Sequence, residues 1–283
     1  IRGTLARLGW VNGANVEFDE RWATDNLDRV REAAAELAEA RVDVILTTGS
    51  RIVPIVQRAT ATIPIIFVGV SDPVGQGLVT SLARSGNNTT GFSLLEFDGE
   101  RSPLMNKLFE IMLELSPGLA RAAIMFNPAN PAHRFHARTF RETASRLQIE
   151  AVEARISGLA DIEMAIAAFA RTPGGVMLLP SDLTLLGNRD RIVDLMARYR
   201  LPAIYSDRSF VEAGGLCSYS ADRSEMFKRA AEYANRILRG ERVGDLPVQQ
   251  PTRYEFVIHL ATVRTLGISL PTHVLARADE VIE

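Results

Sequence analysis

Residues 42–73 hold the feature that most limits how this chain folds, namely two short apolar runs, each followed by a small polar turn. The runs at residues 42–47 and 63–68 are rich in Val and Ile, which predicts two buried strands. A helix is expected between them, and a strand, a helix and a strand in this order make a right-handed crossover with parallel strands. Both turns then lie at the same carboxyl edge of one sheet, where open α/β folds bind ligands.

The two turns carry residue types that begin helices. Ser50 closes the first turn, and Asp72 closes the second, directly before Pro73. Ser50 and Asp72 are therefore predicted to be N-caps, with Pro73 at the first helical position. Two neighbouring helix N-termini with free N–H groups suit a small anion such as a carboxylate.

The rest of the chain continues this alternation in two series, the second of which begins after Pro117 and Gly118. The further predicted strands are residues 16–22, 89–93, 122–126, 149–155, 175–179, 202–206 and 215–218, with a strand-like stretch at 246–258. One further helix is predicted to begin at Asp25 or Asn26. The other predicted helices cover residues 73–82, 104–115, 131–147, 160–170, 189–199 and 224–238.

Two consecutive series of this kind predict an α/β fold with two doubly wound parallel-sheet lobes. The last helix and the stretch after it indicate that the chain returns to lobe one and crosses again to lobe two. We therefore expect residues 1–93 and 220–247 in lobe one, and residues 94–219 and 248–283 in lobe two. Several crossings make a multi-strand hinge, and a ligand cleft is expected between the lobes.

Composition excludes several classes of function. Lys and Arg together number 32 against 34 Asp and Glu, and no basic run carries aromatic residues, so no nucleic-acid partner is expected. No apolar stretch reaches about 18 residues, so no segment of this sequence is expected to span a membrane. The single cysteine, Cys217, forbids an internal disulfide and leaves the compartment open.

Residues 1–10 predict the last turns of a helix, with Leu5 and Leu8 facing inward and Gly9 as the C-cap. A parallel α/β sheet usually begins with a strand before such a helix. We therefore expect a first strand, and any targeting segment ahead of it, to precede residue 1.

Thirteen stretches, among them NPANP at residues 127–131 and LPVQQP at 246–251, recur in this order in one protein family. The others are residues 8–15, 21–23, 42–45, 72–74, 77–82, 90–91, 201–205, 210–215, 218–219, 237–240 and 276–283. With this ordered set, the chain resembles the substrate-binding proteins of bacterial ABC importers, in particular the branch associated with tryptophan and other amino acids.

The resemblance implies a fold similar to that of the two-lobed type I periplasmic binding proteins. It also implies a non-catalytic role, in which closure of the lobes captures an amino acid-like ligand, aromatic or branched, for a membrane permease. Members carry a signal peptide or a lipoprotein signal, so the implied location is periplasmic, or extracytoplasmic with a lipid anchor. The ligand-sensing domain of a regulator shares this fold and remains the alternative. A permease and an ATPase encoded beside the gene would favour transport, and a helix-turn-helix upstream would favour regulation.

A zwitterionic amino acid needs hydrogen-bond donors for its carboxylate, and an anion or carbonyl groups for its ammonium. In lobe one, Thr48, Gly49, Ser50 and Ser71 are the expected donors, and helix capping is the alternative explanation for them. Asp72 either caps its own helix or binds the ammonium.

In lobe two, Asn127, Asp182 and the turn at residues 205–207 follow strands at the facing edge. Asp182 is the strongest candidate for the ammonium, and N-capping of the next helix is its alternative. Tyr205 either stacks on the ligand or packs in the core, and Ser206 follows it in the same turn.

Three further residues are candidates for the site. Ser93 and Tyr219 occur where the chain is expected to change lobes, so hinge packing competes with ligand contact. Trp22 ends a predicted strand of lobe one, and it either forms an aromatic wall of the site or packs in the core.

Catalytic and metal chemistry is not expected, and neither is a cofactor. His133 and His136 have no cluster of Cys, Asp or Glu to complete a metal site, and they are interpreted as surface histidines. The phosphate-loop, dinucleotide-binding and nucleophile-elbow motifs are missing from the sequence. Cys217 lies in an apolar strand, which predicts a buried and inert thiol.

Overall fold

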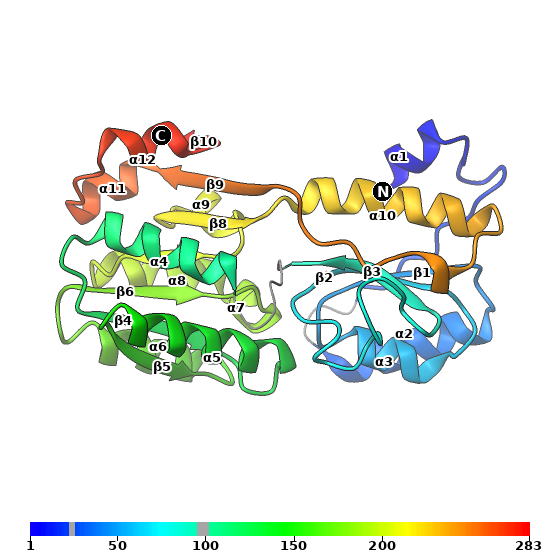
Figure 1. The fold of residues 1–283 in the computed structure, drawn as a ribbon, viewed down its shortest axis with the longest axis horizontal. Helices are drawn as coiled ribbons and strands as arrows, with labels where there is room; N and C mark the ends of the chain where they lie inside the picture. Colours follow the sequence, from blue (N-terminus) through cyan, green and yellow to red (C-terminus); the bar gives the residue numbers. More distant parts are fainter. Residues whose placement is uncertain (23–25, 95–101) are drawn as a thin grey trace. The chain divides into compact units, whose positions relative to one another are not determined.

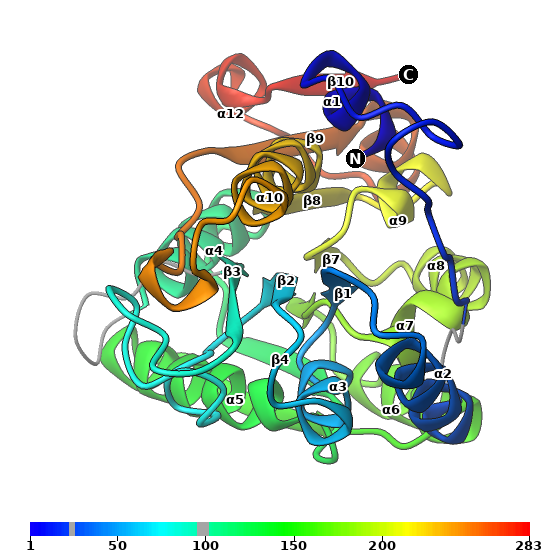
Figure 2. The same ribbon diagram turned by 90° about the vertical axis from the view of Figure 1, so that its right-hand side faces the viewer.

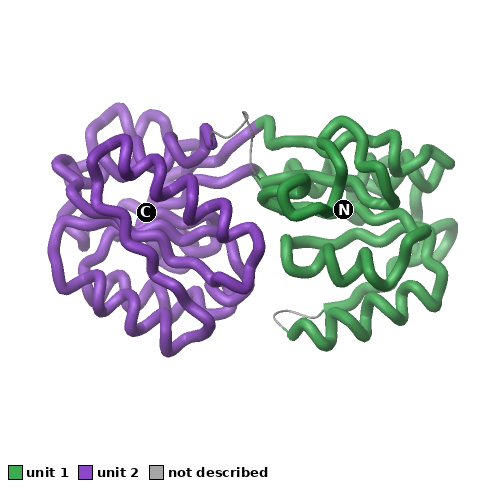
Figure 3. The backbone as a smooth tube through the Cα atoms, turned by 60° about the horizontal axis from the view of Figure 1, so that its bottom comes forward, with its two compact units in different colours: residues 1–95, 222–252 green, residues 96–221, 253–283 purple. Residues whose placement is uncertain are grey.

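A computed structural model of the chain describes residues 1–22, 26–94 and 102–283. The chain divides into two compact units (Figure 3). Unit 1 comprises residues 1–95 and 222–252, and unit 2 comprises residues 96–221 and 253–283. The chain therefore passes from one unit to the other three times. The predicted α/β fold with two units built on parallel strands is confirmed.

Unit 1 is built on a parallel sheet with the strand order β1-β2-β3. Its strands are β1 (Ile45–Thr48), β2 (Ile65–Val70) and β3 (Thr89–Ser93). Its helical elements are α1 (Arg2–Arg7), α2 (Leu27–Glu39), α3 (Val53–Ala59), α10 (Arg223–Leu238) and the 3-10 helix at Val243–Asp245. In Figure 1, α2 and α3 cover one face of this sheet and α10 covers the other.

Burial on both faces explains the composition of the central strand. Every residue of β2 is buried, because α10 and the pair α2 and α3 enclose it. Val30 and Ala34 of α2 and Ile55 of α3 pack with Ile45 and Ile65 in one apolar cluster. A continuous apolar run of this kind is what a parallel strand covered on both faces requires.

Unit 2 has a seven-stranded sheet with the order β10-β9-β8-β7-β6-β4-β5. Its strands are β4 (Arg121–Phe126), β5 (Glu150–Arg155), β6 (Gly175–Leu179), β7 (Ala203–Tyr205), β8 (Cys217–Ala221), β9 (Tyr254–His259) and β10 (Glu280–Ile282). The sheet is not wholly parallel, since β9 runs antiparallel to β8. The chain leaves unit 2 directly after β8 and re-enters it directly before β9, so the start of β9 pairs with the end of β8.

Helices cover both faces of the unit 2 sheet. In Figure 2, α4 and α5 lie on one side of it, and α6 and α8 lie on the other. The helices are α4 (Pro103–Leu115), α5 (Pro131–Arg146), α6 (Leu159–Phe169), α7 (Leu183–Gly187), α8 (Arg189–Arg198), α9 (Ser209–Glu212), α11 (Leu260–Leu266) and α12 (Thr272–Arg277). The helix predicted at residues 104–115 is confirmed as α4, and its Leu104, Leu108, Ile111 and Leu115 are all buried. None of the helices described in the structure is long and apolar enough to cross a membrane.

Two predicted elements of unit 1 are wrong. Residues 16–22 form no strand, because alternation alone supplies no backbone partner and the only bridge there joins Val16 to Asn12. Residues 73–82 form a series of turns and not a helix. Gly77 in that segment has φ +70°, a left-handed conformation that ends a helix.

Predictions at the start of the chain are confirmed in part, since Leu8 is only partly buried and is itself the C-cap of α1. Leu5 is buried in α1, and Gly9, two residues after the end of this helix, has φ +95° as expected of a glycine at a helix C-terminus. The Asn26 side chain caps α2 by accepting hydrogen bonds from the N–H groups of Asp28 and Arg29. Asp25, the alternative cap, lies outside the described residues.

Candidate functional site

The two predicted turns, after β1 and after β2, lie together at the carboxyl edge of the unit 1 sheet, as expected. Gly49, with φ +87°, follows β1 and donates its N–H to the carbonyl of Val68 at 3.2 Å. The buried Ser50 hydroxyl accepts a hydrogen bond from the N–H of Ser71 at 3.4 Å. Ser50 was predicted to be the N-cap of the helix that follows it. This prediction is wrong, because Ile52 is the N-cap of α3. The hydroxyl instead ties the turn after β1 to the turn after β2.

Asp72 caps a turn and not a helix. Its Oδ1 accepts the N–H of Gly75 at 2.8 Å, which is the hydrogen bond that an N-cap makes. Because no helix follows, the expected pair of neighbouring helix N-termini does not form. The predicted anion site therefore lacks one of the two helix N-termini from which it was inferred. Thr48, another expected donor, is the last residue of β1.

A cation that the sequence analysis missed lies at this edge. Gly69 forms an irregularity in the pairing of β2 with β3 and has φ +79°. A Cβ atom at Gly69 would lie 3.7 Å from Nη2 of Arg223, so the guanidinium lies directly beside this turn. Arg223 is the first residue of α10, far away in the sequence, and only the return of the chain to unit 1 brings it here.

The other two candidates of unit 1 differ in exposure. Ser93 ends β3, is fully buried, and donates its N–H to the carbonyl of Gln249 at 2.8 Å. Trp22 is 82% exposed, so the interpretation of this residue as a core tryptophan is wrong. The interpretation as an aromatic wall stays a prediction.

The carboxyl edge of unit 2 holds a connected network of buried polar side chains. Asn127 follows β4 and Asp182 follows β6, and these two strands are neighbours in the sheet. Nδ2 of Asn130 donates to Oδ2 of Asp182 at 2.8 Å, and Nδ2 of Asn127 lies 3.4 Å from the hydroxyl of Thr184. The two loops are thus joined to each other by side chains.

Asp182 has both of its carboxylate oxygens engaged. Oδ1 accepts the N–H of Thr184 at 2.9 Å, so Asp182 is the N-cap of α7, as its alternative interpretation states. Oδ2 accepts the amide of Asn130, whose own Oδ1 caps α5 by accepting the N–H of Ala132. A ligand ammonium would have to share a carboxylate that the protein already satisfies, and the ammonium role of Asp182 stays a prediction.

His133 belongs to this network, and the prediction that it is a surface histidine is wrong. It is fully buried, and its Nδ1 accepts the backbone N–H of Asn127 at 2.9 Å. The spacing of His133 with Ala137, Phe140 and Ala144 could have revealed this, because these residues form one buried stripe of α5. The pKa of the neighbouring His136, which is partly buried, is lowered to about 3, chiefly by the loss of hydration.

The aromatic candidates of unit 2 occupy two environments. Tyr205 is fully buried and stacks on Phe210, with ring centroids 4.6 Å apart, and burial raises the pKa of its hydroxyl. The core interpretation of Tyr205 is therefore the one that fits. Tyr219 stacks on Tyr254 at 5.4 Å, close to where β8 and β9 enter or leave the unit. Cys217 is a buried free thiol whose pKa is raised by burial, as predicted.

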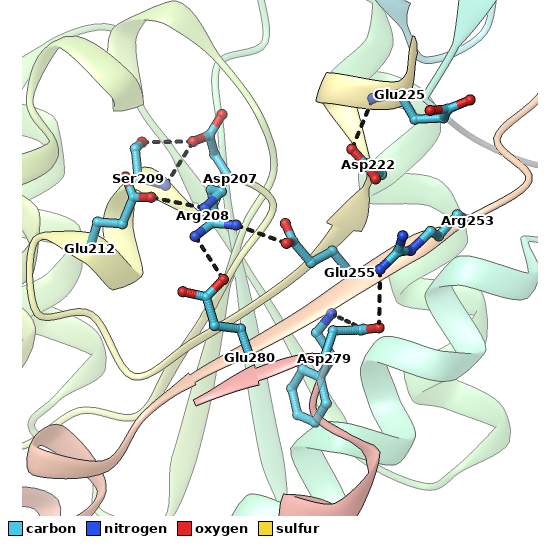
Figure 4. A network of polar contacts seen from close by, with 11 residues as sticks. Asp207, Arg208, Ser209, Glu212, Asp222, Glu225, Arg253, Glu255, Asp279 and Glu280 are labelled. Carbon is cyan, nitrogen blue, oxygen red and sulfur yellow. Dashed lines mark hydrogen bonds and ion pairs between the residues drawn. The ribbon is translucent and has the colours of Figure 1, made fainter. Parts of the chain in front are cut away.

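A cluster of charged side chains gathers around the loop after β7. Ser206, the first residue of this loop, donates its N–H to the carbonyl of Leu179 at 3.0 Å. Arg208 contacts three carboxylates, those of Glu212 at 2.8 Å, Glu255 at 2.8 Å and Glu280 at 3.0 Å (Figure 4). These carboxylates come from α9, β9 and β10, so one guanidinium joins the helix that directly follows it to two strands that are distant in sequence. Their proximity raises the pKa of Arg208 further.

The candidate residues at the two edges are polar groups that donate or accept hydrogen bonds. Among the described residues, no group of three or more His, Cys, Asp or Glu is placed to hold a metal ion. The two edges and most of their loops were predicted from the sequence. Asn130, Thr184, Arg208 and Arg223 were not, because their roles depend on tertiary contacts.

Comparisons with known proteins agree with this description. A family model described as ABC transporter substrate binding protein matches residues 1–282. The chain is 26% identical over 265 residues to a protein named tyrosine-binding protein from Clostridioides difficile (strain R20291), which covers 93% of this chain and 74% of that relative.

Two solved structures share the fold along nearly the whole chain. A conserved domain protein from Vibrio cholerae O1 biovar El Tor is similar with a TM-score of 0.91 and 28% identity, over 99% of this chain and 92% of that one. An ABC domain from Streptococcus pneumoniae, solved in complex with L-Trp, has a TM-score of 0.90 and 21% identity over the same shares. At this level of identity, the second likeness concerns the fold alone.

Proposed function

Because the chain belongs to the family of ABC transporter substrate-binding proteins, we propose that it is the solute-binding component of an ABC importer. The observation that carries this proposal is the match of the family model to residues 1–282, which leaves almost no part of the chain outside it. The proteins of this family bind substrates and are not enzymes. In this role the protein works outside the cytoplasmic membrane and delivers its ligand to a membrane permease.

The proposed ligand is an amino acid with an aromatic or branched side chain. The relative named tyrosine-binding protein supports this class of ligand. The chemistry of the two edges is compatible with it, since Arg223 and the hydroxyls of Thr48 and Ser50 suit a carboxylate. The exposed ring of Trp22 and the stacked ring of Tyr219 offer aromatic surface for a side chain.

Groups from both carboxyl edges are proposed to contact the ligand, with closure of the two units upon it. In unit 2 these are Asn127, Asn130 and Asp182, which the network described above holds in place. The sensing domain of a regulator, the alternative function, receives no support from a specific feature of the described residues.

Thermal unfolding against the twenty amino acids, with sugars and small carboxylates as further ligands, tests the proposal. A ligand at about 1,000 times its dissociation constant stabilises the folded protein by roughly 4 kcal/mol, which raises the midpoint by several degrees. We expect L-Tyr, L-Trp or a branched amino acid to give the largest shift. Stabilisation by sugars alone would contradict the proposed ligand class.

A further inference from the structure

A buried histidine joins the two candidate loops of unit 2. His133 lies in the first turn of α5, and its side chain is fully buried. Nδ1 faces the loop after β4, where it accepts the N–H of Asn127 at 2.9 Å. Nε2 faces the loop after β6, 3.4 Å from the carbonyl of Ser181 and 4.0 Å from Oδ2 of Asp182.

These partners fix the protonation state and the tautomer of the ring. The N–H of Asn127 is a donor, so Nδ1 must carry a lone pair and no proton. The carbonyl of Ser181 and the carboxylate of Asp182 are acceptors, so Nε2 must carry the proton. The imidazole is therefore neutral, and each nitrogen engages a different loop.

The position of Asn127 depends on this ring. Oδ1 of Asn127 accepts the N–H of Ala129 at 2.9 Å, so the loop turns back on itself directly after β4. The backbone N–H of Asn127 has His133 as its hydrogen-bond acceptor, and an unsatisfied buried N–H is costly. Without an acceptor at Nδ1, the loop would have to rearrange to satisfy this group.

We propose that His133 is the positioning residue of the candidate site in unit 2, where it holds the loop after β4 against the loop after β6 and thereby presets Asn127 for the ligand. This inference rests on the proposed function, because it takes Asn127 as a ligand contact. His133 is expected to hold the loop after β4 in place whether or not a ligand is bound. Ordering the loop in advance removes an entropic cost that binding would otherwise carry.

Three substitutions separate positioning from the filling of space. His133→Asn places an amide oxygen where Nδ1 lies and keeps an acceptor for the N–H of Asn127. His133→Gln reaches toward the position of Nε2, and His133→Leu has no polar atom, although both fill the space better than Asn does. His273→Asn is the matched control, since that side chain is 64% exposed on α12.

The measurements are the dissociation constants of the full chain for L-Tyr and L-Trp, and the hydrogen exchange of the Asn127 amide without ligand. We expect His133→Asn and the control to bind within about threefold of the parent, and His133→Gln and His133→Leu to bind about tenfold more weakly or worse. The Asn127 amide is expected to exchange faster in the Gln and Leu variants only. The ¹⁵N spectrum of the parent is expected to show His133 as the neutral Nε2–H tautomer.

Each outcome has one meaning. If affinity and Asn127 protection follow side-chain volume, with Gln and Leu better than Asn, His133 only fills space and the inference is wrong. An Nδ1–H tautomer would overturn it as well. If the parent binds neither amino acid, the aromatic part of the proposed ligand class fails, while the exchange and ¹⁵N results still decide whether His133 positions the loop.

Discussion

At the carboxyl edge of unit 2 the polar side chains bond to one another, whereas at the edge of unit 1 they bond mainly to the backbone. Asn130 and Asp182 in unit 2 satisfy each other and also cap the helices that follow them. In unit 1, Ser50 and Asp72 each accept one backbone N–H. The first arrangement is a network that fails when one member is lost, and the second is a set of separate contacts.

The difference follows from what comes after the strands. In unit 2, the strands β4 and β6 lead into helices whose N-caps, Asn130 and Asp182, lie close enough to share a hydrogen bond. In unit 1, β2 leads into turns, and α3 has no side-chain cap. Neighbouring capped helices therefore preset the edge of unit 2, while glycine-containing turns shape the edge of unit 1.

The two units also differ in the residues that can serve as experimental probes, namely tryptophans and histidines. The protein has two tryptophans, Trp10 and Trp22, and both belong to unit 1. Its four histidines all belong to unit 2. Tryptophan fluorescence therefore reports on unit 1 alone, and acid sensitivity that depends on histidine arises in unit 2 alone.

The largest effect is expected from Asp182→Ala. The substitution removes the cap of α7 and leaves the buried amide of Asn130 without its acceptor, which together cost unit 2 about 3 kcal/mol of unfolding free energy. Urea unfolding followed by circular dichroism measures the loss, and the tryptophan fluorescence transition is expected to move much less. Asp190→Ala, at a side chain that is 77% exposed, is the control. A loss of under 1 kcal/mol, or an equal shift in fluorescence, would break the contrast between the units.

The sequence was sufficient to predict the elements that local patterns determine. Apolar runs of five or six residues gave β2, β4 and β6, because a strand buried on both faces must be apolar throughout. Residues 16–22 were predicted wrongly, because a strand also needs a neighbour that the alternation does not reveal. At residues 73–82, Gly75 and Gly77 outweighed the favourable Asp72 and Pro73, and turns formed instead.

The candidate site was less accessible to prediction than the fold. Parallel strands put Asn127 and Asp182 at one edge, and the sequence alone predicted that much. The bond from Asn130 to Asp182 joins residues that are 52 positions apart, and no local pattern specifies it. Arg223 reaches the edge of unit 1 only because the chain returns there after completing most of unit 2.

A second effect, dependent on pH, is expected from His136→Gln in unit 2. Burial lowers the folded-state pKa of His136 from 6.5 to about 3, so between these values the unfolded chain binds a proton that the folded protein does not. Stability is therefore lost as pH falls below about 6.5, by about 2 kcal/mol at pH 5. We expect the variant to lose correspondingly less stability between pH 7 and pH 5, as measured by urea unfolding. His273→Gln is the control, and equal acid sensitivity of the parent and the His136 variant would contradict the assignment.

The smallest effect is expected from Ser50→Ala in unit 1. The substitution removes one acceptor, at the long distance of 3.4 Å, from the N–H of Ser71, and no second side chain loses a partner. The expected loss is about 1 kcal/mol or less, and it is expected in the tryptophan fluorescence transition that reports on unit 1. Ser81→Ala, at an exposed turn of the same unit, is the matched control. If Ser50→Ala cost as much as Asp182→Ala, the hydroxyl would belong to a network like that of unit 2, and the two edges would not differ in the way that their hydrogen bonds indicate.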